Sequence, residues 1–256
     1  MRKYISKGII CVKGSLGLVY AVCKITYTLS EDDNYEFVFE PNYPVIDLLD
    51  SSVFQGIPGL NLDLRKKEYI RNNSIPTFIS ERVPTEKRED YFELLSKVNM
   101  EFMDPIEYLI RSKEQYSGDK LFVKPYNDKA TISLDFKGNE TNSTIIKHIL
   151  ENICLGNDII INNQIIDDTN RKMFYDVFIK IYSRSYMLKK EAQKQGIISA
   201  KKTGIYKGRK PIIVDELKFR GMLLRVEKKQ ISPKQAAKEL NISIDKYYRF
   251  KKQLQN

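Results

Sequence analysis

The sequence predicts an α+β protein with three parts: a small mixed N-terminal domain, a long connecting helix, and a C-terminal three-helix domain that contains a helix-turn-helix. Three observations lead to this prediction. Short segments rich in β-branched and aromatic residues fill the first 40 residues, a helical repeat runs through residues 168–202, and capped helical patterns follow residue 215. With 256 residues and 42% hydrophobic residues, the chain has enough apolar mass to bury a core.

The first part is predicted to contain three strands and a loop-rich stretch. Residues 8–28 are dense in β-branched and aromatic residues and are interrupted by Gly14 and Gly17, which indicates two strands around a turn. Residues 35–40 alternate aromatic and polar side chains and indicate a third strand. Prolines then recur up to about Leu64, so that a long regular element is not expected there.

Further elements complete this first domain, which we place at residues 1–126. Helices are expected from Pro76, over residues 86–98 and over residues 105–111, because each begins with a proline, a capping residue or a run of glutamates. Strands are expected at residues 121–124 and 131–135. The next segment, residues 127–203, shows no clear pattern in its first part and ends in the long helix.

The long helix is predicted from Asp168 to about Lys202. Its first half has apolar residues at three- and four-residue steps, whereas its second half is polar and basic. Two interpretations remain open. Residues 173–188 form a dimer interface and the helix continues as a connection to the next domain, or the helix packs in the core of its own domain and its basic end is frayed. The repeating apolar residues are Met173, Phe174, Val177, Phe178, Ile181 and Leu188.

Composition excludes several classes of protein. No run of eighteen apolar residues occurs and the N-terminus has no signal-peptide pattern, so neither a membrane span nor export is expected, and the predicted location is the cytoplasm. Cys11, Cys23, Cys154 and the single His148 are too scattered for a disulfide framework or a zinc site. We therefore expect buried reduced thiols, with no metal and no cofactor.

The positive charge is concentrated at the C-terminal end. From residue 184 onwards the chain has 20 Lys and Arg against 6 Asp and Glu, whereas the first 183 residues have 23 against 27. An excess of cations on about seventy residues is typical of a polyanion-binding domain, because each phosphate contact releases condensed counterions. A merely solvated basic surface would show the same composition.

The third part, residues 204–256, is predicted to contain three helices after a basic arm. A helix over residues 215–228 presents Leu217, Phe219 and Leu224. Ser232 caps a second helix with Pro233 at its first turn, and Ser243 caps a third helix over residues 244–254. Paired alanines at 236 and 237 permit the close crossing that a helix-turn-helix requires.

The phase of the third helix divides its residues into two sets. Ile242, Tyr247 and Phe250 are predicted to be core. A generic three-helix bundle that binds protein remains the alternative to a DNA reader. The residues predicted to face outward, where base edges would be met, are Ile244, Asp245, Lys246 and Arg249.

The arm at residues 204–211 reads Gly-Ile-Tyr-Lys-Gly-Arg-Lys-Pro. Its glycines and proline favour an extended backbone with cations on both sides, which suits the narrow minor groove of A·T-rich DNA. A basic linker would have a similar composition.

Together, KKTGIYKGRKP and SPKQAAKELNISIDKYYRFKK resemble the DNA-binding end of serine recombinases of the resolvase/invertase family, over roughly residues 184–254. Asp245 departs from the pattern, because the family tends to carry a small hydroxyl residue there. A carboxylate repels phosphate, and it is favourable in the major groove only where it accepts a hydrogen bond from a cytosine amino group. The resemblance implies double-stranded DNA as a partner, and the implied DNA-binding residues are Gly204, Tyr206, Lys207, Gly208, Arg209, Lys210, Ser232, Ser243, Ile244, Lys246 and Arg249.

The catalytic motifs of that family are not found. A serine recombinase needs a nucleophilic serine near its N-terminus and several arginines around the phosphate. Ser6 and Ser15 are available, but no arginine occurs between Arg2 and Arg65, and neither Tyr-x-Arg-x-Ser nor Asp-Arg-x-x-Arg is present. We therefore expect no catalysis and assign no catalytic residue. A decayed catalytic domain, or an active one with displaced residues, remains open.

The segments YEFVFEPNYPVIDLLDSS, IPTFISERVPTEKREDYFELL and DPIEYLIRSKEQYSGDKLFVKP resemble, in this order, the N-terminal subdomain of HipA-type toxin kinases. Arg82 and Val83 depart from the two leucines usual in that family. The kinase core is missing, since neither a phosphate loop nor a paired Asp motif is present. The matching residues are Phe37, Phe39, Pro41, Pro76, Phe78, Pro84, Arg88, Tyr108, Leu109, Gly118, Asp119 and Val123.

These observations predict a cytoplasmic, non-enzymatic, sequence-specific DNA-binding protein, acting as a homodimer. The resemblances imply an antitoxin-like transcriptional regulator whose front domain binds a HipA-like kinase, as in the three-gene HipBST arrangement. Three alternatives remain: a serine recombinase, an accessory or plasmid-maintenance factor without a toxin partner, and a front domain that only dimerises or positions the DNA reader.

Overall fold

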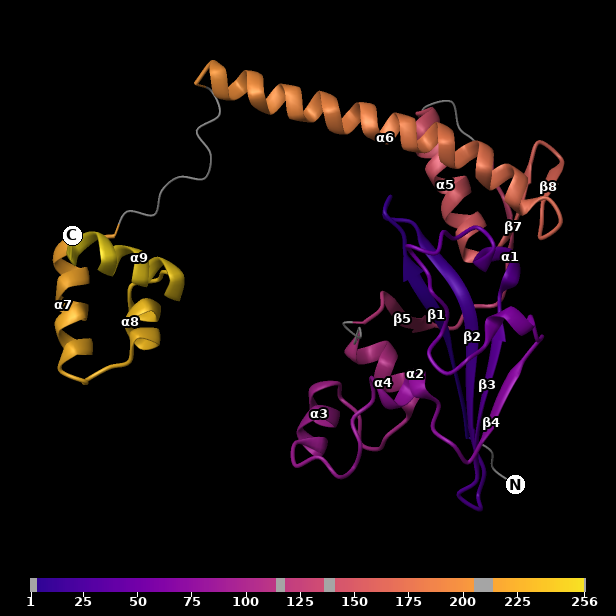
Figure 1. The fold of residues 1–256 in the computed structure, drawn as a ribbon, viewed down its shortest axis with the longest axis horizontal. Helices are drawn as coiled ribbons and strands as arrows, with labels where there is room; N and C mark the ends of the chain where they lie inside the picture. Colours follow the sequence, from indigo (N-terminus) through magenta and orange to yellow (C-terminus); the bar gives the residue numbers. More distant parts are fainter. Residues whose placement is uncertain (1–3, 114–117, 136–140, 205–213, 256) are drawn as a thin grey trace. The chain divides into compact units, whose positions relative to one another are not determined.

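The computed structural model describes residues 4–113, 118–135, 141–204 and 214–255. The chain is of mixed α and β structure and divides into two compact units, residues 1–191 and residues 192–256. Figure 1 shows the path of the chain through both units. The domain boundary predicted at residue 126 therefore differs from the observed division, which lies between residues 191 and 192.

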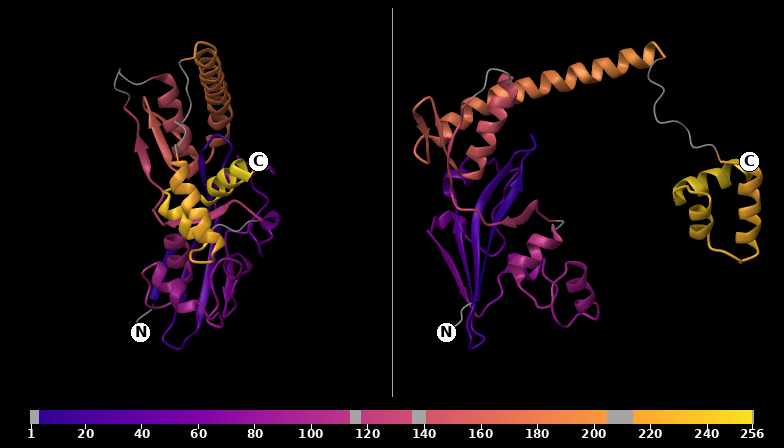
Figure 2. Two further views of the ribbon diagram at one scale, coloured as in Figure 1. Left: turned by 90° about the vertical axis from the view of Figure 1, so that its left-hand side faces the viewer. Right: turned by 180° about the vertical axis from the view of Figure 1, so that it is seen from behind.

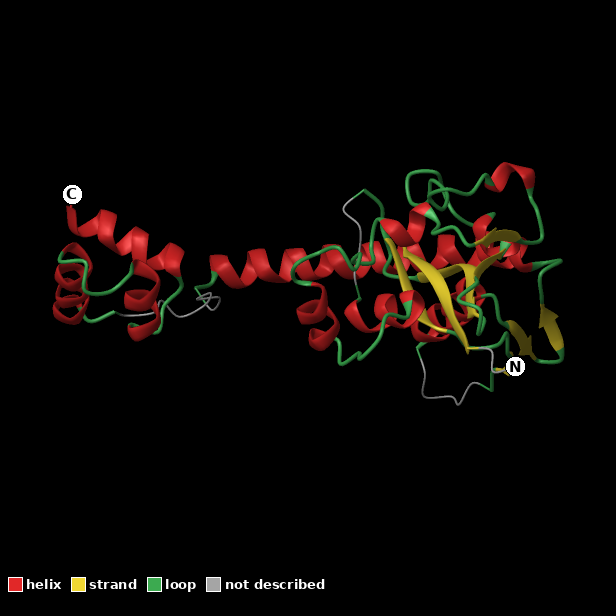
Figure 3. Cartoon of the chain, turned by 90° about the horizontal axis from the view of Figure 1, so that it is seen from below, coloured by secondary structure: helices red, strands yellow, loops and turns green. Residues whose placement is uncertain are grey.

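The N-terminal unit is built on a five-stranded antiparallel sheet with the strand order β4-β3-β2-β1-β5 (Figure 1). The strands predicted at residues 8–28, 35–40 and 121–124 are confirmed, and Gly14 and Gly17 lie in the turn between the first two. In Figure 3 these strands are drawn in yellow. The strands are β1 (Tyr4–Lys13), β2 (Val19–Leu29), β3 (Tyr35–Pro41), β4 (Tyr69–Asn72) and β5 (Leu121–Pro125).

Short helices and turns connect and cover this sheet. The loop-rich stretch predicted up to Leu64 contains only the four-residue α1 and a short 3-10 helix, η1. The helix predicted over residues 86–98 begins only at Tyr91 and ends at Lys97, and in the turns before it Arg88 Nε donates to the carboxylate of Asp90 at 2.8 Å. The elements are α1 (Tyr43–Ile46), η1 (Leu62–Leu64), α2 (Thr77–Ser80), α3 (Tyr91–Lys97) and α4 (Pro105–Ser112).

The segment after residue 126 folds onto the same core, which the sequence did not reveal. The helix α5 (Asn142–Leu155) packs against β2, and Ile149, Leu150 and Ile153 are buried with the side chains of the large sheet. A second sheet has the order β6-β7-β8, and β6 confirms part of the strand predicted at residues 131–135. Its strands are β6 (Thr131–Ser133), β7 (Asp158–Ile161) and β8 (Gln164–Ile166).

The turn after α5 requires Gly156. Its φ of +80° is left-handed, and a Cβ at this position would lie 2.5 Å from the side-chain nitrogen of Asn42. The fully buried Arg171 donates to the carbonyl oxygens of Ile153 and Gly156, at 3.2 and 3.1 Å, and to the carboxylate of Asp168 at 2.8 Å. The arginine therefore ties the end of α5 to the start of the next helix.

The long helix is confirmed as α6 (Arg171–Lys202). Two further views show α5 beside the first part of α6, where Lys189 Nζ also lies 3.0 Å from Ser143 Oγ (Figure 2). The buried face of α6 has Tyr175 and Tyr182 at its centre, flanked by Phe174 and Phe178. The interpretation of α6 as a core helix therefore explains only the face that carries Tyr175 and Tyr182. Apolar residues on the other face remain exposed: Met173, Val177, Ile181 and Leu188.

Two further expectations were tested by the fold. All three cysteines are free and buried, as predicted, and burial raises the pKa of Cys11 to about 12. Among the described residues, no helix combines the length and the apolar character needed to cross a membrane.

Candidate nucleic-acid interface

Three helices form the described end of the C-terminal unit, at the positions that the sequence predicts. Each begins with a hydrogen-bonded side chain, because the first backbone N–H groups of a helix have no partner within it. Asp215 accepts hydrogen bonds from the backbone nitrogens of Leu217 and Lys218, at 2.9 and 3.3 Å. The helices are α7 (Glu216–Glu227), α8 (Pro233–Glu239) and α9 (Ile244–Gln255).

A small core joins the three helices. The rings of Phe219 and Tyr247 lie 5.3 Å apart, and Phe250 lies 5.7 Å from Phe219. Ala236 and Ala237 are buried where α8 meets α9, because only small side chains allow that approach. Tyr247 is 1% exposed and belongs to this core, and its burial raises the pKa of the hydroxyl.

Two apolar residues of α7 do not join this core. Leu217 is 82% exposed and Leu224 is 57% exposed, although the sequence analysis grouped both with Phe219. The buried side of α7 instead consists of Phe219 with Met222, Leu223 and Val226, which recur at three- and four-residue steps. Leu217 lies two residues before Phe219 and therefore on another side of the helix.

The connection between α8 and α9 is short, and a left-handed residue and a helix cap determine its conformation. Asn241 has a left-handed φ of +56°, a conformation that asparagine tolerates better than most residues. Ser243 Oγ then accepts from the backbone nitrogen of Lys246 at 3.3 Å. At the start of α8, Ser232 and Gln235 form a reciprocal capping box, with distances of 3.2 and 2.8 Å.

The two predicted contact serines therefore have local structural roles. The hydroxyl groups of Ser232 and Ser243 each occupy an acceptor position at the start of a helix. Both residues are exposed, but the Ser232 hydroxyl already donates to Gln235 Oε1 at 3.0 Å, so that its hydrogen is not available to a phosphate oxygen in this arrangement.

The outward side of α9 differs in one residue from the prediction. Ile244, Asp245 and Arg249 are exposed, as expected. Lys246 is only half exposed, because its stem lies along Phe250 and its ammonium group is 5.9 Å from that ring. Tyr248 is 52% exposed and belongs to the outward set instead. Its spacing of four residues from Ile244 was the signal that could have identified it.

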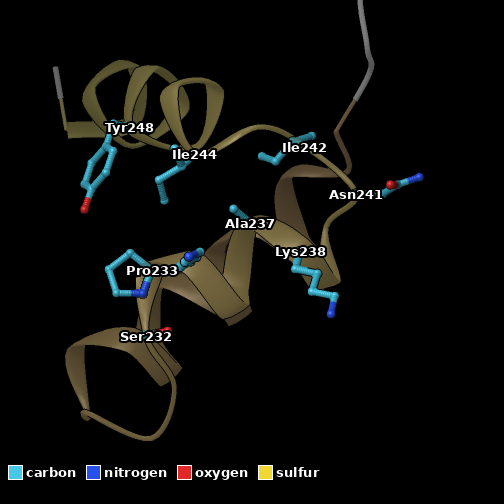
Figure 4. Close-up of a pocket in the computed structure, with 9 residues that line it drawn as sticks. Ser232, Pro233, Ala237, Lys238, Asn241, Ile242, Ile244 and Tyr248 are labelled. Carbon is cyan, nitrogen blue, oxygen red and sulfur yellow. The ribbon is translucent and has the colours of Figure 1, made fainter. Parts of the chain in front are cut away.

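A groove lies between α8 and α9 (Figure 4). Ile244 and Tyr248 project from α9 toward Pro233 and Ala237 of α8, and Lys238 lies at the other end. The groove therefore combines an apolar wall with polar ends. Its lining residues are Ser232, Pro233, Lys234, Ala237, Lys238, Asn241, Ile242, Ile244 and Tyr248.

Several cations near the groove are not neutralised. Arg220 pairs with Glu216 at 2.6 Å, and Arg225 of α7 pairs with Glu239 of α8 at 3.1 Å. Within the described part of the chain, no carboxylate forms an ion pair with Lys234, Lys238 or Arg249, all of which are exposed. Unpaired cations on one pair of helices create a positive potential that an anionic ligand can neutralise.

The predicted arm is mostly outside the described residues. Gly204 is described: its φ is +71°, and its nitrogen donates to the carbonyl oxygen of Lys201 at 3.2 Å, so that it ends α6 as a left-handed cap. The remaining arm residues named by the sequence analysis, Tyr206, Lys207, Gly208, Arg209 and Lys210, lie outside the described residues.

Ser6 and Ser15, the two serines near the N-terminus that could act as nucleophiles, have different surroundings. Ser6 lies on β1, where its hydroxyl donates to the buried carboxylate of Asp104 at 3.0 Å. The second oxygen of Asp104 accepts from Tyr4 at 2.7 Å, and its first also caps α4. Ser15 is exposed in the turn between β1 and β2. A carboxylate beside Ser6 disfavours a phosphodiester at that hydroxyl.

The described residues contain no group of three or more His, Cys, Asp and Glu side chains that could hold a metal ion. A comparison with known protein families, curated proteins and solved structures finds no match to this chain.

Proposed function

We propose that the protein is a sequence-specific, non-enzymatic DNA-binding regulator that contacts double-stranded DNA through α8 and α9. The observation that carries this proposal is the shared surface of these two helices. Exposed, unpaired Lys234, Lys238 and Arg249 surround side chains of α9 that the core does not use. A surface that offers both cations for phosphates and free side chains for base edges suits the major groove of a duplex.

In this proposal α8 and α9 form the helix-turn-helix, with α9 as the recognition helix. Support comes from the short left-handed turn at Asn241 and from the alanine contact that brings the helices together. The N-terminal half of α9 would enter the groove, which places Ile244, Asp245 and Arg249 near base edges. The basic arm before α7 would then track the adjacent minor groove, as the sequence resemblance implies.

A second copy of the chain is the proposed partner for the exposed face of α6. Met173 and Leu188 are each 60% exposed and Val177 is 51% exposed, on the side of the helix opposite Tyr175 and Tyr182. A surface helix normally carries one apolar stripe, so that a second exposed stripe indicates an interface. A dimer would present two recognition helices to two half-sites, which raises both affinity and specificity.

The N-terminal unit is proposed to bind a protein partner, in line with its resemblance to the subdomain that HipA-type kinases carry. At Arg82, where the sequence departs from that family, the side chain is buried and makes several specific contacts. Its guanidinium group pairs with Asp119, donates to the carbonyl oxygen of Phe78 at 2.9 Å and lies 4.4 Å from the Phe78 ring. The chain would then be an antitoxin and its repressor in one polypeptide, acting in the cytoplasm.

The central experiment is a gel-shift titration of the full chain on random and A·T-rich duplexes at several salt concentrations. We expect retention that weakens as salt increases, because phosphate contacts release counterions. Replacing Lys238 by Ala should weaken binding to every sequence, and the slope of log K against log salt should fall by about one, because the proposal places this exposed cation at the phosphate backbone.

Lys218→Ala is the matched control, because Lys218 is an exposed cation of α7 that does not line the groove. It should leave binding nearly unchanged. Absence of any salt-sensitive retention at low ionic strength would contradict the proposed function. Nicking of supercoiled plasmid that disappears in Ser6→Ala or Ser15→Ala would instead favour the recombinase alternative.

A further inference from the structure

The groove between α8 and α9 contains an apolar wall of partly exposed side chains. Ile244 is 37% exposed and Tyr248 is 52% exposed, whereas the core of this unit is completed by Phe219, Ile242 and Tyr247. Ile244 and Tyr248 lie one helical turn apart and project together toward Pro233 (Figure 4). Exposed apolar side chains that converge on a groove indicate a ligand with a matching apolar group.

The surroundings of this wall restrict the ligand. Lys234 and Lys238 line the same groove from α8, and neither has a carboxylate partner within the described residues. Asn241 adds an exposed amide at one end. A ligand that fits must therefore carry negative charge around a small apolar projection.

Among the groups that double-stranded DNA displays, only one has this character at a base edge. The C5-methyl group of thymine projects into the major groove, and phosphates lie on both sides of it. The other groups on the major-groove edges of the bases are hydrogen-bond donors and acceptors, which Ile244 cannot satisfy.

We propose that the groove formed by Ile244, Tyr248, Pro233 and Ala237 seats thymine methyl groups and thereby determines which sequences the protein prefers. This inference rests on the proposed function, and it names the base that the outward face of α9 reads. Lys234 and Lys238 position the flanking backbone in this arrangement, while the ring of Tyr248 and the side chain of Ile244 contact the methyl group.

The test uses the full chain and a duplex enriched from a random library by repeated binding. The same duplex is then synthesised with deoxyuridine in place of thymidine at one position at a time. Deoxyuridine pairs identically and lacks only the C5-methyl group. We expect affinity to fall about fourfold for each methyl group that the groove holds, and to remain unchanged at other positions.

Substitutions at the groove should remove this discrimination. In Ile244→Ala and in Tyr248→Ala, the thymine and deoxyuridine duplexes should bind equally at the positions that the wild-type protein distinguishes. Tyr248→Phe should keep the discrimination, because the ring is retained. Leu224→Ala is the matched control: it truncates an apolar residue of the same unit that is 57% exposed, close to the 52% of Tyr248, and that does not line the groove.

The outcomes separate the two claims. If no duplex is enriched or retained, the proposed function itself fails, and the groove is better explained as a protein-binding surface. If duplexes bind but tolerate deoxyuridine at every position, DNA binding stands and the methyl-reading groove is wrong. Discrimination that survives in both Ile244→Ala and Tyr248→Ala would also overturn the assignment to this groove.

Discussion

The hydroxyl oxygens of Tyr20 and Tyr175 lie 2.7 Å apart, in a contact that joins β2 of the large sheet to α6. The two rings meet edge to face, with centroids 6.2 Å apart, and both residues are buried. Burial is the largest cause that raises the pKa of each hydroxyl, so both remain protonated over the physiological range. This pair attaches the long helix to the sheet through one buried polar contact.

Tyr175→Phe should destabilise the N-terminal unit by about 1–3 kcal/mol, because the Tyr20 hydroxyl would lose its principal partner while remaining buried. Urea unfolding of the full chain would measure this loss. Tyr186→Phe, at a position 38% exposed on the same helix, is the control and should change stability little. The double variant Tyr20→Phe with Tyr175→Phe should regain part of the loss. If Tyr175→Phe, Tyr186→Phe and the double variant all lowered the free energy of unfolding equally, the contact between Tyr20 and Tyr175 would not be the cause.

Acid should weaken the junction between α5 and α6. Burial acts to raise the pKa of Asp168, but hydrogen bonds from Arg171 and Lys129 outweigh it and hold the pKa below its usual 3.8. A carboxyl group whose pKa is lowered on folding contributes stability that is complete above its unfolded pKa, near 4, and is lost as the pH falls through the folded value. Stability contributed by Asp168 should therefore disappear below about pH 4.

Asp168→Asn tests this dependence. The variant should lose about 1.5–3 kcal/mol at pH 7, because a hydrogen bond to the buried charge of Arg171 is weakened. The difference from wild type should shrink as the pH is lowered to 3. Asp32→Asn is the control: that residue is exposed in the turn between β2 and β3, and no cation pairs with its carboxylate in the described structure. A constant difference at both pH values would contradict the linkage.

The exposed stripe of α6 should control the oligomeric state. Light scattering of the wild-type chain should give twice the mass of one chain. Val177→Lys combined with Ile181→Lys should give the single-chain mass without unfolding, because both residues are about half exposed. Leu64→Lys adds the same charge at an apolar residue 59% exposed on η1 and should leave the dimer intact. A monomeric wild-type chain would remove α6 as a dimer interface.

Gly221→Ala should stabilise the C-terminal unit by about 1 kcal/mol. Gly221 lies inside α7, and a Cβ there would have no atom within 4 Å, so alanine removes chain entropy without a clash. Hydrogen exchange of residues 214–255 would show slower opening. Gly156→Ala should have the opposite effect on its own unit, because that glycine has a positive φ and a close neighbour. Stabilisation by both changes would invalidate this reasoning.

Much of the fold could be predicted from residue patterns, where each pattern had one structural interpretation. Alternating aromatic residues gave β3, and capping residues located α8 and α9 to within one or two positions. No element was predicted for the isoleucine-rich stretch from 145 to 166, because short apolar runs fit a buried helix and a buried strand equally well. In the structure it supplies α5, β7 and β8.

The candidate site was predictable in its helices and less so in its side chains. The core positions Ile242 and Tyr247 followed from spacing, and both are buried. Lys246 was predicted to face outward, yet it is partly buried and its ammonium group lies 5.9 Å from the Phe250 ring. Tyr248 was assigned to neither set, although its four-residue spacing from Ile244 places it on the outward side. A lysine can cover apolar surface and a tyrosine can remain exposed, so residue type alone did not decide their orientation.

The core of the three C-terminal helices contains five buried side chains, two of which are alanines. A hydrophobic centre of that size stands near the lower limit for autonomous folding. A duplex that binds only the folded form shifts the equilibrium by mass action, by about 2.7 kcal/mol at a hundredfold excess over its Kd. If the proposed DNA binding holds, limited proteolysis should therefore cut residues 214–255 more slowly in the presence of a binding duplex than in the free protein.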